Sequence, residues 1–139
     1  MISMRYPVKL DKTEEGIFVI GFLDIPEILV QGDTKEKALK MAKDKLLAMF
    51  GAYFKNNKKL PEPSEIVGDY IELPVSVVAK ILMLNLFLDS KITQVELAQK
   101  MGVKKQEITR LFNLRHSTKI DTINQAIIAM GKNLNISLS

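Results

Sequence analysis

Two prolines separated by a single residue constrain this chain more than any other feature. They lie in the segment Leu60-Pro61-Glu62-Pro63-Ser64, directly after a helical pattern that ends within residues 56–59. Proline cannot continue a helix, and it disfavours helical geometry in the residue before it, so the segment favours an extended connector. A chain of 139 residues has room for one domain or two small ones. The connector favours two, and we place them at residues 1–68 and 69–139.

The two parts differ in charge. Residues 1–73 carry 11 basic and 12 acidic side chains, whereas residues 74–139 carry 9 basic and 4 acidic ones. The basic second half makes nucleic acid a candidate partner, although a basic solvated surface explains the charge equally well.

The residue types that are missing exclude several chemistries. There is no cysteine, which excludes a disulfide framework, a thiolate metal site and a cysteine nucleophile, and is typical of a reducing compartment. His116 is the one histidine, so a His-rich metal site or a His-based catalytic triad would depend entirely on it. We expect no metal and no cofactor. The sequence contains no apolar run of membrane-spanning length and no secretory pattern, so we expect a cytoplasmic protein without a membrane partner.

Residues 1–68 predict a small α+β module. Tyr6, Val8 and Leu10 alternate with Pro7 and Lys9, which indicates a half-buried strand, and the proline favours an edge position for it. Residues 17–20 and 28–30 predict two further strands, the first of which forms a hairpin with the initial strand.

A helix follows the three strands. Asp33 and Glu36 have the spacing of a capping box, with the Asp33 side chain as the predicted cap. The helix then carries one apolar stripe, which would cover the small sheet. Its members are Ala38, Leu39, Ala42, Leu46, Met49, Phe50 and Tyr53.

The second module begins with a short strand at 69–73, and Pro74 then opens a helix. Residues 75–88 are apolar on nearly every side, so this helix must be buried on more than one face. A module this small has little mass with which to cover the helix, and the alternating pattern near the C-terminus predicts a strand that needs a partner. We therefore predict a homodimer or higher oligomer that uses Ile81, Leu84, Leu88, Leu134, Ile136 and Leu138.

Residues 93–113 predict two short helices joined by a tight turn. Thr93 and Glu96 form a second capping box, and Gly102 lies where the chain must turn, with a positive φ expected. The second helix places Ile108, Leu111 and Phe112 on one face and polar side chains on the other. This arrangement is typical of a helix-turn-helix, whose second helix enters a DNA major groove, and the alternative is an ordinary helical hairpin with a polar exterior.

The polar residue types suit DNA. An arginine can bind guanine through two donors, a glutamine can bind adenine in the same way, and the methyl group of a threonine can contact thymine. The predicted base-reading residues are Lys105, Gln106, Thr109, Arg110 and Asn113. The predicted phosphate contacts are Gln94, Lys104, Arg115, His116 and Lys119.

At this point the chain resembles known families. Residues 93–131 resemble helix-turn-helix repressors of the Cro/C1 type. Nearly the whole chain resembles HicB antitoxins of type II toxin–antitoxin systems. The segments that carry this resemblance are Met4-Arg5-Tyr6-Pro7-Val8, Gly21-Phe22-Leu23-Asp24-Ile25-Pro26-Glu27, Gln31-Gly32-Asp33-Thr34 with Ala38, Lys105-Gln106-Glu107-Ile108-Thr109-Arg110-Leu111-Phe112-Asn113-Leu114, and Lys119-Ile120-Asp121.

The resemblance implies a partner and a mechanism. HicB proteins bind HicA, a small mRNA-cleaving toxin, and cover its catalytic surface through an N-terminal module with a partial ribonuclease H-like fold. Their C-terminal module binds the operator of the toxin–antitoxin operon and represses it. By this resemblance, residues 1–68 would bind the toxin, residues 69–139 would bind DNA and dimerise, and the chain would not be an enzyme.

Two rival interpretations remain. A nuclease in the first module would need several carboxylates around a metal ion, but Asp33 fits a helix cap, Asp11 a turn and Asp24 a bend. His116 has no nearby carboxylate that would orient it as a general base. The second rival is a one-component repressor whose N-terminal domain senses a small ligand.

Overall fold

A computed structural model describes residues 5–59 and 61–138, so Met4 and Leu60, both used above, lie outside the described residues. The chain divides into two compact units, one made of residues 5–53 and 61–74 and the other of residues 54–59 and 75–138. The α+β class is confirmed: a four-stranded antiparallel sheet with one helix is followed by a helical region.

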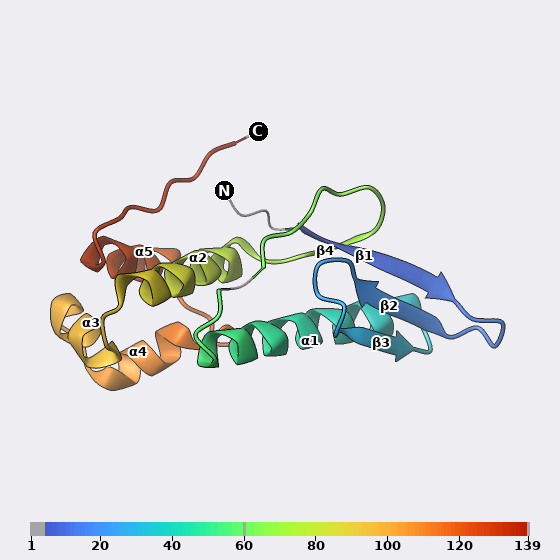
Figure 1. Ribbon diagram of the computed structural model, residues 1–139, viewed down its shortest axis with the longest axis horizontal. Coiled ribbons are helices and arrows are strands. Elements are labelled where there is room, and N and C mark those ends of the chain that lie inside the picture. The colour runs from blue at the N-terminus through green and yellow to red at the C-terminus, as the bar shows by residue number, and fades with distance from the viewer. Residues whose placement is uncertain (1–4, 60, 139) are drawn as a thin grey trace. The chain divides into compact units, whose positions relative to one another are not determined.

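The sheet of the first unit contains β1 (Arg5–Lys12), β2 (Phe18–Phe22), β3 (Leu29–Gly32) and β4 (Tyr70–Glu72). The strands lie in the order β3-β2-β1-β4, and every neighbouring pair is antiparallel (Figure 1). The predicted strand at 69–73 therefore belongs to the first unit, because it pairs with β1. The boundary between the units falls after Pro74 rather than after residue 68.

The predicted edge position of β1 is wrong, because β1 lies between β2 and β4. Pro7 is tolerated there because of where its nitrogen points. The Pro7 carbonyl accepts from the Leu23 N–H at 3.2 Å, beyond the first ladder pair of Val8 with Phe22. The nitrogen of Pro7 faces the same side, past the end of β2, so its missing N–H removes no ladder hydrogen bond.

Helix α1 (Lys35–Lys55) lies along one face of the sheet (Figure 1). Its cap is Thr34 rather than the predicted Asp33, since the Thr34 hydroxyl accepts from the Lys37 N–H at 3.1 Å. The buried stripe is narrower than predicted and consists of Ala38, Ala42, Leu46 and Phe50.

The connector is tied to the first unit by side chains. A carboxylate oxygen of Asp24 accepts from the Ser64 N–H at 2.8 Å, and the Ser64 hydroxyl donates to the other oxygen. The Tyr6 hydroxyl donates to the Pro61 carbonyl at 3.1 Å, while its buried ring packs against Phe50 with a centroid separation of 5.4 Å. These contacts fix the connector to the sheet.

The second unit contains α2 (Val75–Ser90), α3 (Gln94–Met101), α4 (Lys105–Phe112) and α5 (Ile120–Ala129). Helix α2 contacts α5 and α4, and α3 contacts both α4 and α5. Phe54 packs edge-on against Phe112, and Phe112 packs in the same way against Phe87.

One prediction about dimerisation needs correction. Ile81 and Leu84 are 0% and 1% exposed, because they are buried within the chain's own core, and they cannot form a contact between copies without a rearrangement. Residues 132–138 form no strand in the single chain. The strand was predicted to pair across a dimer, so it stays a prediction. Leu88 and Leu134 are half-buried, and Ile136 and Leu138 are exposed.

Candidate nucleic-acid interface

Two reciprocal hydrogen bonds fix the start of α3. The Thr93 hydroxyl accepts from the Glu96 N–H at 3.1 Å, and the Glu96 carboxylate accepts from the Thr93 N–H at 3.2 Å. At the other end Gly102 has a φ of 69°, in the left-handed region that favours glycine. The Val103 N–H donates to the Ala98 carbonyl at 3.0 Å and so closes the helix end. The predicted capping box and glycine turn are confirmed.

Helix α4 has one buried face and one exposed face. Its residues Ile108 and Leu111 are buried. The exposed face contains Lys105, Gln106, Thr109 and Arg110. The structure therefore brings four of the five predicted base-reading residues together on one surface. We call these four residues the α4 polar face.

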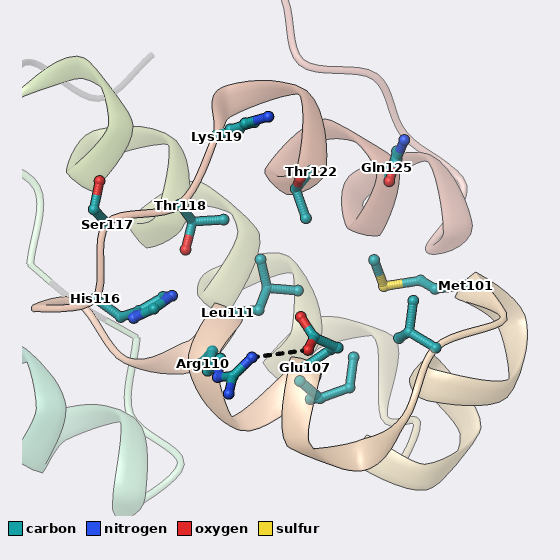
Figure 2. Close-up of a pocket in the computed structure, with 12 residues that line it drawn as sticks. Met101, Glu107, Arg110, Leu111, His116, Ser117, Thr118, Lys119, Thr122 and Gln125 are labelled. Carbon is teal, nitrogen blue, oxygen red and sulfur yellow. Dashed lines mark hydrogen bonds and ion pairs between the residues drawn. The ribbon is translucent and has the colours of Figure 1, made fainter.

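Arg110 already has a defined position on this face. Its guanidinium lies 3.0 Å from a carboxylate oxygen of Glu107, one turn earlier (Figure 2). Exposed ion pairs of this kind contribute roughly 0.2–1 kcal/mol. A bidentate contact with guanine is worth about 1–3 kcal/mol, so it would compete successfully for Arg110.

Asn113 differs from the prediction. It follows α4 with an extended backbone, and its side-chain oxygen accepts from the Arg115 N–H at 3.0 Å. The helix ends one residue too early to present Asn113 on the α4 polar face. Its side chain instead stabilises the loop that leads to α5.

Most predicted phosphate contacts surround the α4 polar face. Lys104 directly precedes α4, Arg115 and His116 lie in the loop after it, and Lys119 directly precedes α5. All four side chains are exposed. Gln94, the first residue of α3, is half-buried. A cavity of about 190 Å³ lies between α4 and the start of α5. Arg110, His116 and Lys119 are among the residues that line it (Figure 2).

Lys80 has a role that the sequence pattern did not predict. It lies in α2, is 1% exposed, and is the one buried charged residue in the described parts of the chain. Its ammonium donates to the carbonyls of Asn113 at 2.8 Å, His116 at 2.7 Å and Arg110 at 3.3 Å. Burial lowers its pKa to about 8. The sequence did contain one feature that could have indicated this role. Lys80 is the single charged residue between Pro74 and Asp89.

The described residues offer neither a metal site nor a membrane span. Residues 5–59 and 61–138 contain no group of three or more His, Cys, Asp or Glu side chains placed to hold a metal ion. Within those same ranges, every helix is too short or too polar to cross a membrane.

Comparison with known proteins identifies the class of this chain. A family model described as a HicB-like antitoxin of a bacterial toxin–antitoxin system matches residues 5–82. Antitoxin HicB 1 of Photorhabdus laumondii subsp. laumondii is 56% identical over 136 residues, which cover 98% of this chain and 88% of that protein. Antitoxin HicB of Escherichia coli strain K12 is 51% identical over 135 residues, which cover 96% and 98%.

A more distant relative, antitoxin HicB of Pseudomonas fluorescens, is 29% identical over 140 residues, which cover 98% of this chain and 96% of that protein. The class is thus that of an antitoxin from a bacterial toxin–antitoxin system. The chain belongs to the HicB-like antitoxin family.

Proposed function

We propose that this antitoxin neutralises a small mRNA-cleaving toxin of the HicA type and represses its own operon by binding operator DNA. The family membership supports the first activity. The α4 polar face supports the second, because it is an exposed helical surface of side chains whose chemistry suits contacts with bases, and exposed cations lie near it in the sequence. Both activities are binding events, so the protein is not an enzyme in this proposal, and it acts in the cytoplasm, where operator and toxin are found.

The α4 polar face is the observation that carries the DNA-binding proposal. Arg110→Ala should weaken operator binding by about 1–3 kcal/mol, because it removes a two-donor contact with one base. Gel-shift titration of the full chain at fixed salt measures this loss. Lys45→Met is the control, since Lys45 is an exposed cation of α1 in the other unit. Equal affinities of Arg110→Ala and the wild type would remove Arg110 from the site.

We assign toxin binding to the first unit, which contains residues 5–53 and 61–74, in agreement with the N-terminal toxin-binding module that the family resemblance implies. The Arg110→Ala chain should then still protect cells that express the toxin, because it changes only the second unit. Growth of cells that co-express toxin and variant measures this protection. Growth arrest with a folded variant would contradict a separate toxin-binding unit.

A homodimer is part of the proposal, because paired half-sites on DNA need paired helices. A cavity of about 220 Å³ lined by Leu82, Leu86 and Ile127 lies beside residues 132–135. The exposed Ile136 and Leu138 extend beyond it and remain the proposed contacts, together with Leu88 and Leu134. Sedimentation equilibrium of the full chain tests this, and a monomeric mass at micromolar concentration would oppose it.

The alternative is a one-component repressor that senses a small ligand. The first unit contains a shallow cavity of about 350 Å³ lined by Leu39, Tyr70 and Ile71, among others. A neighbouring reading frame for a small basic protein would favour the antitoxin, whereas its absence would favour the ligand sensor.

A further inference from the structure

Lys80 connects the buried core of the second unit to the edge of the α4 polar face. Its ammonium has three N–H donors, and each lies within hydrogen-bond distance of a backbone carbonyl oxygen. The acceptors belong to Arg110 in the last turn of α4, Asn113 directly after it, and His116 in the following loop. A single side chain thus binds the backbone at three points across the end of α4.

The chemistry of these acceptors explains why a charged group is stable there. The last carbonyls of a helix have no partner within the helix and carry partial negative charge, so a cation beside them is favourable. An apolar side chain would remove all three of these hydrogen bonds. The Arg110 carbonyl would keep the Asn113 N–H at 3.2 Å, and the Asn113 carbonyl would keep the His116 N–H at 3.1 Å. Burial of a lysine is costly in general, and the cost is offset here by charge-assisted hydrogen bonds.

The segment held by Lys80 carries two of the predicted phosphate contacts. Arg115 and His116 follow Asn113 closely, and both side chains are exposed. The Asn113 side chain adds a further hydrogen bond, to the Arg115 N–H. The position of these two side chains therefore depends on the backbone of residues 110–116, which Lys80 holds through its hydrogen bonds to three carbonyls.

We propose that Lys80 is a positioning residue of the DNA interface, which holds the backbone from Arg110 to His116 so that Arg115 and His116 meet the phosphates. This inference rests on the proposed DNA binding. Lys80 itself contacts no DNA, because it is buried.

The salt dependence of binding separates positioning from mere stability. Each phosphate that the protein neutralises adds about 0.9 to the slope of log K against log salt concentration. A variant that is only less stable lowers the fraction of active protein and leaves this slope unchanged. A variant whose loop no longer presents its cations neutralises fewer phosphates, so its slope becomes shallower.

The test uses the full chain and the variants Lys80→Met and Lys45→Met. We expect Lys80→Met to bind operator DNA roughly tenfold more weakly, with a slope shallower by about one unit for each phosphate that the loop no longer reaches. Lys45→Met, the same change at an exposed site in the other unit, should retain the wild-type slope. Should Lys80→Met fail to fold, Lys80→Gln replaces it, because its amide can still donate to two carbonyls, and an intermediate slope is expected.

A double-mutant cycle with Arg115→Ala completes the test. If Lys80 acts through Arg115, the Arg115→Ala change should cost less in the Lys80→Met background than in the wild type. An unchanged slope together with additive effects would overturn the inference about Lys80 while wild-type DNA binding stands. Absence of DNA binding by the folded wild type would instead overturn the DNA-binding proposal, and with it this role of Lys80.

Discussion

The pKa of Lys80 is lowered to about 8 because burial disfavours the ammonium, whereas an exposed lysine titrates near 10.5. Between these pH values the unfolded chain binds more protons than the folded chain, so the free energy of unfolding contributed by this group rises with pH. Below about pH 8 both states are protonated, and the contribution is constant. We predict that the wild type gains stability relative to Lys80→Met between pH 8 and 10.5, on the order of 2–3 kcal/mol.

Urea unfolding of both proteins across this pH range, at constant ionic strength, measures the difference. In the difference between the two proteins, the contributions of the titrating groups that they share cancel, and Tyr6 is one of these groups. Burial raises the pKa of Tyr6, so its contribution falls as pH rises above 10 and has the opposite sign. Parallel stability curves for wild type and variant would show that Lys80 keeps an ordinary pKa.

At the same scale, helical periodicity was enough to predict the exposure of Gln106, Thr109 and Arg110, because side chains at this spacing share one face of a helix. It could not predict the role of Asn113, which depends on the residue at which α4 ends. Nor could it predict the partners of Lys80, because they are backbone carbonyls of residues distant in the sequence.

At the scale of elements, the turn between α3 and α4 depends on Gly102. Its φ of 69° strains any residue with a Cβ atom, although nothing lies within 4 Å of where that atom would be. We predict that Gly102→Ala lowers the free energy of unfolding by about 1 kcal/mol through backbone strain alone. Thermal unfolding followed by circular dichroism measures this loss.

Gly51→Ala is the matched control for that substitution. Gly51 lies within α1, and a Cβ atom there would also meet nothing within 4 Å. Alanine is the better helix former by about 0.8–1 kcal/mol, so this change should stabilise the protein. If both substitutions changed the unfolding temperature by the same amount in the same direction, backbone strain at Gly102 would not explain the loss.

The elements themselves could be predicted because their signals are local. The Thr93 capping box and the Gly102 turn depend on residues within one or two turns of each other, and both are confirmed. The predicted Asp33 cap was wrong by one position, because Thr34 offers an equivalent oxygen beside it. The predicted strand at 134–138 stays a prediction, because it depends on a partner strand from a second copy of the chain.

At the scale of the whole molecule, the boundary between the units was the hardest feature to predict. The connector prolines indicated a break near residue 60, but the chain returns to the first unit and adds β4 to its sheet. The pairing of Tyr6 with Ile71 joins residues from the two sides of the connector. No local pattern encodes such a pairing, because an antiparallel partner is chosen by the fold as a whole.

This pairing makes a prediction about fragments of the chain. A fragment of residues 1–74 should fold, whereas a fragment of residues 1–68 should be less stable by several kcal/mol. The shorter one lacks Ile71 and Leu73, which are 5% and 1% exposed, and each such side chain contributes about 1.5–3 kcal/mol. The shorter fragment also lacks the Asp69 carbonyl, which accepts from the Val8 N–H at 2.9 Å in the full chain. One side of β1 is then left without its partner strand.

Two measurements on these fragments test the boundary. Thermal unfolding compares their stability, and growth of cells that co-express the toxin compares the protection that they give. We expect the longer fragment to show a cooperative transition and to protect cells, because the sheet is complete and the connector remains tied through Asp24 and Tyr6. The shorter fragment should unfold at a lower temperature and protect less. If both unfold at the same temperature, β4 is dispensable, and the first unit ends at residue 68 after all.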